Sequence, residues 1–216
     1  GKPELGFAFG NSVVIAAVFL TISTLMLPIT AYGVSRTMPQ NRLMRYFYYF
    51  LIIGLFVPFQ AKMIPLIMIT SKLGMMNVPG IIVLYLAGST CEGVFLCAGY
   101  LQSIPPDMEE AAYIDGCNRF TAFIRILLPI AKPGVMVCAI FSFLYAWGDL
   151  AYGMTFIIDQ QSRPITAGIF NFMGQYGTKW SYLTAFAVVT IIPVLLIFIF
   201  MQKYIVGGMT SGAVKG

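Results

Sequence analysis

The sequence predicts an all-α membrane protein, a polytopic bundle of helices, and three observations support this class. Of its 216 residues, 59% are hydrophobic and only 10% are charged, whereas soluble domains carry about 25% charged residues. The apolar residues gather in five long runs, and a bilayer needs about 20 apolar residues per helix. Short polar segments separate the runs. A soluble protein with a very apolar core is disfavoured because it would lack polar surface.

The five runs are interpreted as five spans of a single transmembrane domain over residues 1–216. Each run is long enough to cross the hydrocarbon core as one helix. In chain order the spans are residues 12–32, 46–70, 80–101, 134–158 and 183–204. Four prolines stand within them and can kink their helices: Pro28, Pro58, Pro65 and Pro193.

The lysines and arginines predict the orientation of the spans. Eight of the 13 basic residues lie on the side that follows the first span. These are Arg36, Arg42, Arg45, Arg119, Arg125, Lys132, Lys203 and Lys215. The positive-inside rule places this side in the cytoplasm. The chain would then start outside and end inside, so we expect a sixth span upstream of Gly1 and a cytoplasmic C-terminal tail at residues 205–216.

The polar segment, residues 103–132, is predicted to be a pair of short cytoplasmic helices. Ser103 is expected to cap a first helix that starts at Pro105 and Pro106, because proline is tolerated at the first helical position. Asp115-Gly116 is a stop signal, since glycine readily adopts the left-handed conformation that ends a helix. The first helix is therefore expected to end there.

A second helix is predicted after Asn118, which can cap it. Four apolar residues recur in it at helical spacing and are expected to pack on the bundle: Phe120, Phe123, Ile124 and Leu127. Pro129 and Pro133 are expected to end the unit before the next span. An amphipathic loop resting on lipid headgroups is the alternative interpretation.

The polar segment resembles the EAA motif, the cytoplasmic coupling loop of permease subunits of binding-protein-dependent ABC importers. The resemblance rests on Glu110-Ala111-Ala112, Gly116 and Ile126-x-Leu128-Pro129. Other parts of the chain are similar to the carbohydrate branch of this family, whose best-known type is the maltose-transporter permease. They are Asn11-Ser12, Ile64-Pro65-Leu66, Leu73-Gly74, Ile104-Pro105, Trp147-Gly148-Asp149-Leu150 and the ending from Gly207 to Gly216.

The resemblance implies a type I ABC importer permease fold and a subunit that imports a sugar or oligosaccharide. It also implies that the polar segment docks on an ATPase through eight coupling residues: Glu110, Ala111, Ala112, Asp115, Gly116, Arg119, Arg125 and Pro129. The implied partners are a second permease subunit, expected to be a different chain, two cytoplasmic ATPase subunits and an extracytoplasmic sugar-binding protein. The implied location is the bacterial cytoplasmic (inner) membrane.

Six residues in or beside the spans are candidates for the substrate path. Ionisable groups within a membrane are costly and face a cavity or a partner, and sugar sites combine aromatic faces with polar groups. The candidates are Lys62, Tyr85, Glu92, Trp147, Asp149 and Tyr152. Structural roles are the alternative: an ion pair that holds the bundle, a snorkelling lysine or simple aromatic packing. The external loop from Arg163 to Tyr182 is expected to hold a short helix at residues 165–172.

The sequence lacks the residues that several other function classes require. No G-x-x-x-x-G-K-[ST] motif is present, so we expect ATP and Mg on a partner ATPase and no cofactor on this chain. The four cysteines match no metal or disulfide framework and the chain has no histidine; we therefore expect no metal and no catalytic residues. Nucleic-acid binding is not expected, because the basic residues lie between spans. The alternative function is an ATP-independent secondary transporter or channel, although no internal repeat is visible.

Overall fold

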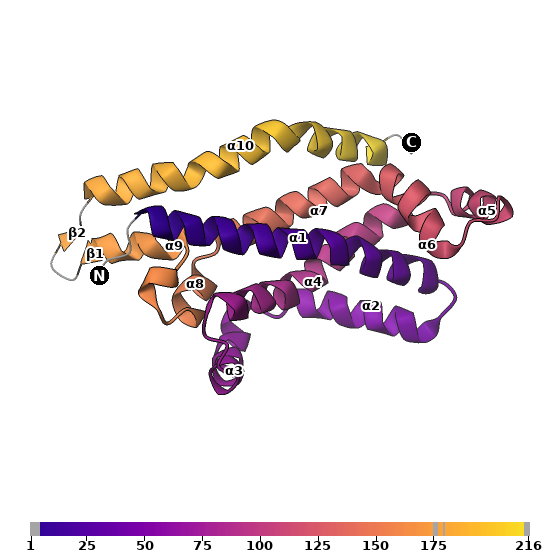
Figure 1. Ribbon diagram of the computed structural model, residues 1–216. Coiled ribbons are helices and arrows are strands. Elements are labelled where there is room, and N and C mark those ends of the chain that lie inside the picture. Colours follow the sequence, from indigo (N-terminus) through magenta and orange to yellow (C-terminus); the bar gives the residue numbers. More distant parts are fainter. Residues whose placement is uncertain (1–4, 175–176, 179, 214–216) are drawn as a thin grey trace. The chain divides into compact units, whose positions relative to one another are not determined.

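The computed structural model describes the backbone of residues 5–174, 177–178 and 180–213, and this part of the chain is almost entirely helical (Figure 1). The chain forms two compact units. The first unit holds Gly1–Ile22, Val57–Ser89 and Phe141–Phe200, and the second holds Ser23–Phe56, Thr90–Ile140 and Met201–Gly216. Four long helices, α1, α4, α7 and α10, contribute residues to both units.

Three of the predicted spans are confirmed as long apolar helices. They are α1 (Leu5–Thr37), α4 (Val78–Gln102) and α10 (Trp180–Ala213). Because α10 continues to Ala213, residues 205–213 of the predicted tail belong to this helix, and residues 214–216 lie outside the described residues.

The fourth predicted span is confirmed with different ends. Its helix, α7, covers Leu128–Gly148, and with the segment before it forms a candidate span from Arg119 to Gly148. The predicted end at residue 158 is wrong, because Asp149 stops α7 and begins the separate helix α8 (Ala151–Phe156).

The second predicted span is wrong as a continuous helix. The run at residues 46–70 is divided between α2 (Arg42–Leu55) and α3 (Phe59–Lys72), which form a bent pair. Pro58 stands at the break with extended backbone angles, φ −65° and ψ 147°, and its missing N–H cannot continue a helical ladder. The other three prolines that we expected to kink spans stand inside helices.

The bent pair is a candidate for a fifth span. Arg36, near the end of α1, forms an ion pair with Glu109, which follows α4 closely. The C-terminal ends of α1 and α4 therefore lie on the same side. If α1 and α4 both cross the membrane, the residues between them cross it too, which favours counting the bent pair as one span beside the four long helices.

The first unit carries the short elements that follow α8. These are the 3-10 turn η2 (Gln160–Ser162), α9 (Ile165–Gly168), η3 (Ile169–Phe172), β1 (Met173–Gly174) and β2 (Gly177–Thr178). The short helix expected at residues 165–172 is thus confirmed as α9 and η3. The two strands pair antiparallel, with Met173 opposite Thr178. The core of this unit is rich in aromatic side chains, among them Phe19, Tyr85 and Phe156.

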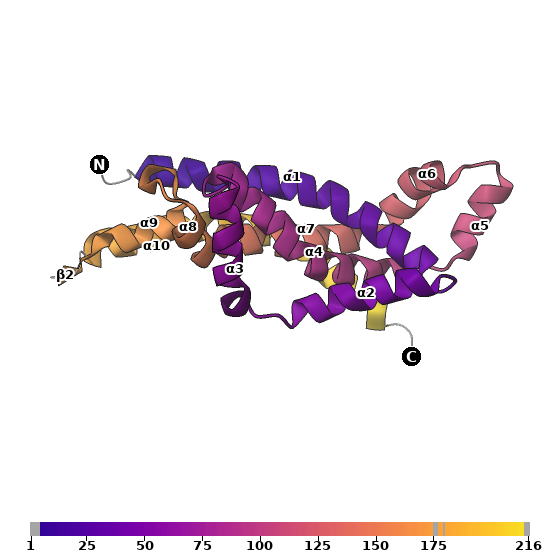
Figure 2. The same ribbon diagram turned by 90° about the horizontal axis from the view of Figure 1, so that it is seen from below.

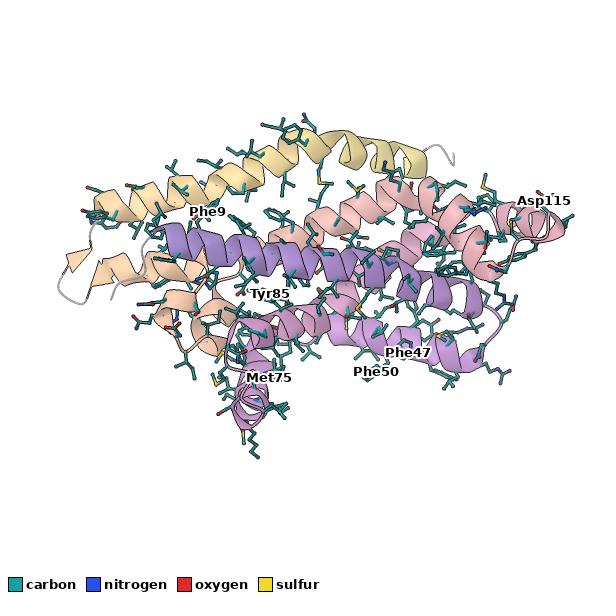
Figure 3. The ribbon with its side chains drawn as sticks, viewed as in Figure 1. Phe9, Phe47, Phe50, Met75, Tyr85 and Asp115 are labelled. Carbon is teal, nitrogen blue, oxygen red and sulfur yellow. The ribbon has the colours of Figure 1, made fainter. Side chains whose placement is uncertain are left out.

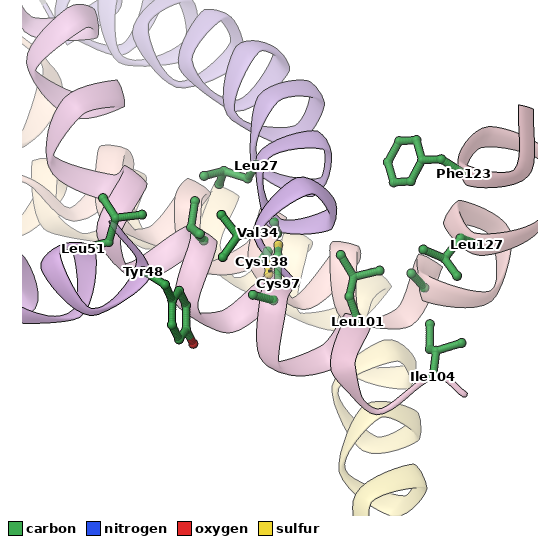
Figure 4. Close-up of a cluster of buried hydrophobic side chains, with 14 residues drawn as sticks. Leu27, Val34, Tyr48, Leu51, Cys97, Leu101, Ile104, Phe123, Leu127 and Cys138 are labelled. Atoms are coloured by element: carbon green, nitrogen blue, oxygen red, sulfur yellow. Dashed lines mark hydrogen bonds between the residues drawn. The ribbon is translucent and has the colours of Figure 1, made fainter. Parts of the chain in front are cut away.

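The second unit carries α5 (Asp107–Ile114), α6 (Arg119–Ala122) and the π-helical turn η1 (Phe123–Leu127). Its core joins α1, α2, α4, η1 and α7 through buried apolar side chains (Figure 4). Gly93 lets α4 approach α1 closely, because a Cβ there would overlap the side chain of Leu27. Small residues at helix contacts are typical of membrane helix packing.

Candidate functional site

The polar segment forms two short helices joined by a tight turn (Figure 2). α5 ends at Ile114, and Gly116 follows with a φ of +83°. The N–H of Cys117 donates to Ala112 O at 2.9 Å, which satisfies a carbonyl at the helix end. The side chain of Asn118 accepts from Thr121 N at 2.8 Å and caps α6. The predicted glycine stop and asparagine cap are both confirmed, and Figure 3 shows Asp115 at the tip of this turn.

Two local predictions about the polar segment are wrong. Ser103 does not cap α5, because its hydroxyl donates back to Tyr100 O at 2.7 Å and α5 starts only at Asp107. Pro129 and Pro133 do not end the unit, since both lie within α7. Pro129 is the second residue of α7, directly after the π-helical turn η1.

The apolar stripe of the second helix is only half buried. Phe123 and Leu127 are buried in the core of the second unit, whereas Phe120 and Ile124 are exposed. Our expectation that all four pack inward is therefore wrong. The helix widens into a π turn at residues 123–127, which adds a residue to the turn and shifts the register of the faces.

The outer surface of the polar segment combines exposed polar and apolar side chains. Among the predicted coupling residues, Ala112 is buried. The other seven are exposed: Glu110, Ala111, Asp115, Gly116, Arg119, Arg125 and Pro129. Four large apolar residues are exposed beside them: Met108, Ile114, Phe120 and Ile124. Ile114 is 86% exposed, and an exposed apolar patch with a polar rim is typical of a protein interaction surface.

Glu109 is the functional candidate that the sequence analysis missed. Glu109 is only 5% exposed, and its carboxylate forms an ion pair with Arg36 of α1, whose Nε donates to Oε1. Arg36 also donates from Nη2 to Ile104 O at 3.2 Å. The Tyr32 hydroxyl donates to Glu109 Oε2 at 3.0 Å. Tyr113 lies at 3.4 Å from the same oxygen, so both carboxylate oxygens have partners.

A local signal for Glu109 exists in the sequence. Glu109 precedes Ala112 by three residues, and residues at this spacing share a face of a helix. Ala112 is buried, so Glu109 on the same face is carried inward.

A second cluster surrounds Asp149 in the first unit. Tyr85, fully buried on α4, donates its hydroxyl to Asp149 Oδ2 at 2.8 Å. The same carboxylate accepts from Tyr152 N at 3.3 Å and Gly153 N at 3.1 Å and so caps α8. Thr166 donates to the carbonyl oxygen of Asp149. The structure thus brings together three of the six substrate-path candidates, in a packed arrangement within one chain.

The other three candidates lie apart from this carboxylate. Trp147 is buried against Phe143 and Phe9, and its indole N–H donates to Thr190 O at 3.0 Å. Lys62 on α3 is half-buried and Glu92 on α4 is exposed. Neither Lys62 nor Glu92 forms an ion pair with another described residue. Substrate contact by any of the six stays a prediction.

The loop from Ile157 to Ile165 is attached to the start of α1 in the first unit. Asn11 Nδ2 donates to Gln161 O at 2.7 Å, and Ser12 Oγ accepts from Ile165 N at 2.8 Å. Within the loop, hydrogen bonds from the Ser162 hydroxyl and the Gln161 N–H lower the pKa of Asp159.

The described residues contain no group of three or more acidic, cysteine or histidine side chains able to hold a metal.

The all-α fold with several candidate spans is the fold of ABC importer permeases of known structure. The fold is confirmed by similar solved structures. A bacterial ABC transporter that imports the acidic polysaccharide alginate matches with a TM-score of 0.80 and 21% identity, over 93% of this chain and 75% of that one. The methionine transporter MetNI, in an inward-facing conformation, matches with a TM-score of 0.77 and 18% identity, over 94% of this chain and 95% of that one.

The chain belongs to the family described as binding-protein-dependent transport system inner membrane component, which it matches over residues 26–211. It is 36% identical to the multiple sugar-binding transport system permease protein MsmG of Streptococcus mutans, over 98% of this chain and 77% of that protein. It is 31% identical to the probable starch degradation products transport system permease protein AmyC of Thermoanaerobacterium thermosulfurigenes, over 98% of this chain and 77% of that protein. The chain is therefore a binding-protein-dependent permease, and the secondary-transporter alternative is not favoured.

Proposed function

We propose that this permease carries a sugar or oligosaccharide and that its polar segment docks on a cytoplasmic ATPase. The observation that carries the proposal is the outer surface of the polar segment. Glu110 and Gly116 of the EAA-like motif are exposed there, beside the exposed apolar residues Ile114 and Phe120. Exposed apolar side chains with charged neighbours suit a protein partner better than water alone.

The substrate class is proposed from the relatives. The names of MsmG and AmyC refer to sugars and starch degradation products, and diacetylchitobiose is named for NgcG of Streptomyces coelicolor, which is 32% identical to this chain. One solved relative is an alginate transporter in complex with a periplasmic protein that holds an alginate pentasaccharide. These names favour a saccharide delivered by an extracytoplasmic binding protein.

The proposed complex contains this chain, a second permease subunit of different sequence and two ATPase subunits that bind ATP and Mg. The polar segment and the C-terminus of α10 lie on the cytoplasmic side of the bacterial inner membrane. Closure of the ATPases on ATP would move the docked segment and switch the spans between inward- and outward-open states, a rigid-body transition. In this proposal Arg119 and Arg125, both exposed, pair with acidic groups of the ATPase or with lipid phosphates.

The test is purification from the native membrane in mild detergent, followed by a search for an ATP-hydrolysing subunit. We expect an ATPase to accompany the wild-type chain and to be lost or uncoupled in Gly116→Pro. Proline fixes φ near about −65°, whereas Gly116 has a φ of +83°, so the turn between α5 and α6 cannot form.

The matched control is Gly33→Ala on α1. Gly33 is exposed, and a Cβ added there meets no atom within 4 Å, so this variant should retain the ATPase. Uptake of a panel of labelled saccharides into vesicles made from the same membranes tests the substrate class. Absence of an ATPase from the folded wild-type chain would contradict the proposal.

A further inference from the structure

The last two turns of α1 contact both halves of the polar segment. Tyr32 and Arg36 are four residues apart and lie on one face of the helix. Arg36 binds Glu109 on α5 and the carbonyl oxygen of Ile104 just before it. The hydroxyl of Tyr32 binds the second carboxylate oxygen of Glu109 at 3.0 Å.

The ring of Tyr32 also contacts the part of the polar segment that follows the Gly116 turn. It stacks on Phe123 of η1, with ring centroids 4.7 Å apart and planes 29° from parallel. One side chain of α1 therefore touches α5 through its hydroxyl and η1 through its ring. We call Tyr32, Arg36 and Glu109 the α1 clamp.

The chemistry of the α1 clamp indicates that it orients the polar segment relative to α1 and does not only fill space between them. Glu109 is buried, and a buried ion pair is often no more stable than well-packed apolar residues of similar size. The carboxylate instead fixes how α5 is oriented relative to α1. Its two oxygens accept from two different side chains, and the planar guanidinium of Arg36 donates from Nε and Nη2 to two different acceptors.

We propose that Tyr32 and Arg36 are positioning residues that make the polar segment move with α1 as one body. The inference rests on the proposed docking function. The chain itself connects the polar segment to α4 and α7, and the α1 clamp adds a third, non-covalent connection. A displacement that an ATPase imposes on α5 then reaches α1 as well as the two helices joined to α5 by the backbone.

The experiment measures the distance between spin labels on introduced cysteines at Gly33 of α1 and Asp107 of α5, both exposed. The four native cysteines are replaced by alanine, and the permease is purified with its co-purifying ATPase. Spectra are recorded without nucleotide and with ATP, Mg and vanadate. We expect the wild-type distance to be the same in both states.

The informative variant is the double change Arg36→Met and Glu109→Met. Removing both charges leaves no unpaired buried ion, so the chain should fold as well as the wild type. The orientation of the polar segment relative to α1 is then no longer fixed. We expect a nucleotide-dependent shift of about 2 Å or more in the distance between the labels. Arg42→Met, which removes an exposed charge of the same sign, should behave as the wild type.

Each other result has a defined meaning. If the distance between the labels stays constant in the double variant, with the ATPase bound, the proposed role of the α1 clamp is wrong and the docking proposal is unaffected. A nucleotide-dependent shift already present in the wild type overturns the proposed role of the α1 clamp too. If no ATPase accompanies the folded wild-type chain, the docking proposal fails and the inference fails with it.

Discussion

At the scale of single residues, the polar segment depends on local contacts at Gly116 and Asn118 and on a distant contact at Glu109. Gly116 and Asn118 carry local signals, because a left-handed glycine and a helix cap act on backbone groups within three residues. The partner of Glu109 is 73 residues away on α1. Spacing alone could place Glu109 on the buried face of α5, but it could not identify Arg36 as its partner.

The same limit applies to the substrate-path candidates. Tyr85 and Asp149 are separate candidates, each named for its chemistry within or beside an apolar run. The structure shows that their side chains are hydrogen-bonded to each other, although the two residues are 64 positions apart in the sequence. Asp149 also accepts from the N–H groups of Tyr152 and Gly153 at the start of α8, so all of these contacts are within the chain. A structural role was the alternative that the sequence analysis had left open.

Replacing Asp149 with alanine should destabilise the protein. The change removes the cap of α8, worth about 1 kcal/mol, and leaves the buried hydroxyl of Tyr85 unpaired, at a cost of about 1–3 kcal/mol. We expect the unfolding midpoint in detergent to fall by about 5 °C or more. Asp107→Ala removes an exposed carboxylate and should change the midpoint little. Equal midpoints for the two variants would contradict the role of Asp149.

At the scale of elements, hydropathy found the long helices but not their interruptions. The run at residues 46–70 is mostly apolar, although it holds Gln60 and Lys62. It contains two prolines, and nothing in the composition shows that the helix breaks at Pro58 and continues through Pro65. The π turn at residues 123–127 has no sequence signal that we identified. It decides which apolar residues of the second short helix face the core and which face outward.

The two faces of this helix should separate stability from docking. Leu127 is fully buried, so Leu127→Ala should cost about 2–5 kcal/mol of folding stability. Ile124 is exposed, and Ile124→Ala should alter stability by no more than about 0.5 kcal/mol yet reduce the amount of ATPase retained. Thermal unfolding and quantification of the co-purified subunit measure the two effects. An Ile124→Ala variant that keeps its full share of ATPase would exclude this residue from the docking surface.

At the scale of the whole molecule, the described residues hold four helices long and apolar enough to cross a membrane, or five spans if the bent pair of α2 and α3 counts as one. The ion pair between Arg36 and Glu109 favours five, because it places the C-terminal ends of α1 and α4 on the same side. The identity of the transported sugar is not encoded in any motif of this chain, and the relatives named above differ in what their names say they carry.

The topology makes opposite predictions for the two ends of the spans. Gln40, after α1, and Gln160, in η2, are both exposed. In a chain with its native cysteines replaced, Gln160→Cys should react with a membrane-impermeant maleimide on intact spheroplasts. Gln40→Cys should react only after permeabilisation. The reverse pattern would mean that the polar segment faces outward and is out of reach of any cytoplasmic ATPase.

The attachment of the loop from Ile157 to Ile165 to the start of α1 has a consequence for synthesis. Asn11 and Ser12 find their partners at Gln161 and Ile165, 150 and 153 residues later in the chain. At about 5–20 residues per second, the ribosome needs roughly 8–30 s to make that interval. During this time the first turns of α1 are already at the membrane with two polar side chains that lack their final partners. The nascent chain must hold this helix in a provisional position until the residues up to Ile165 have been made.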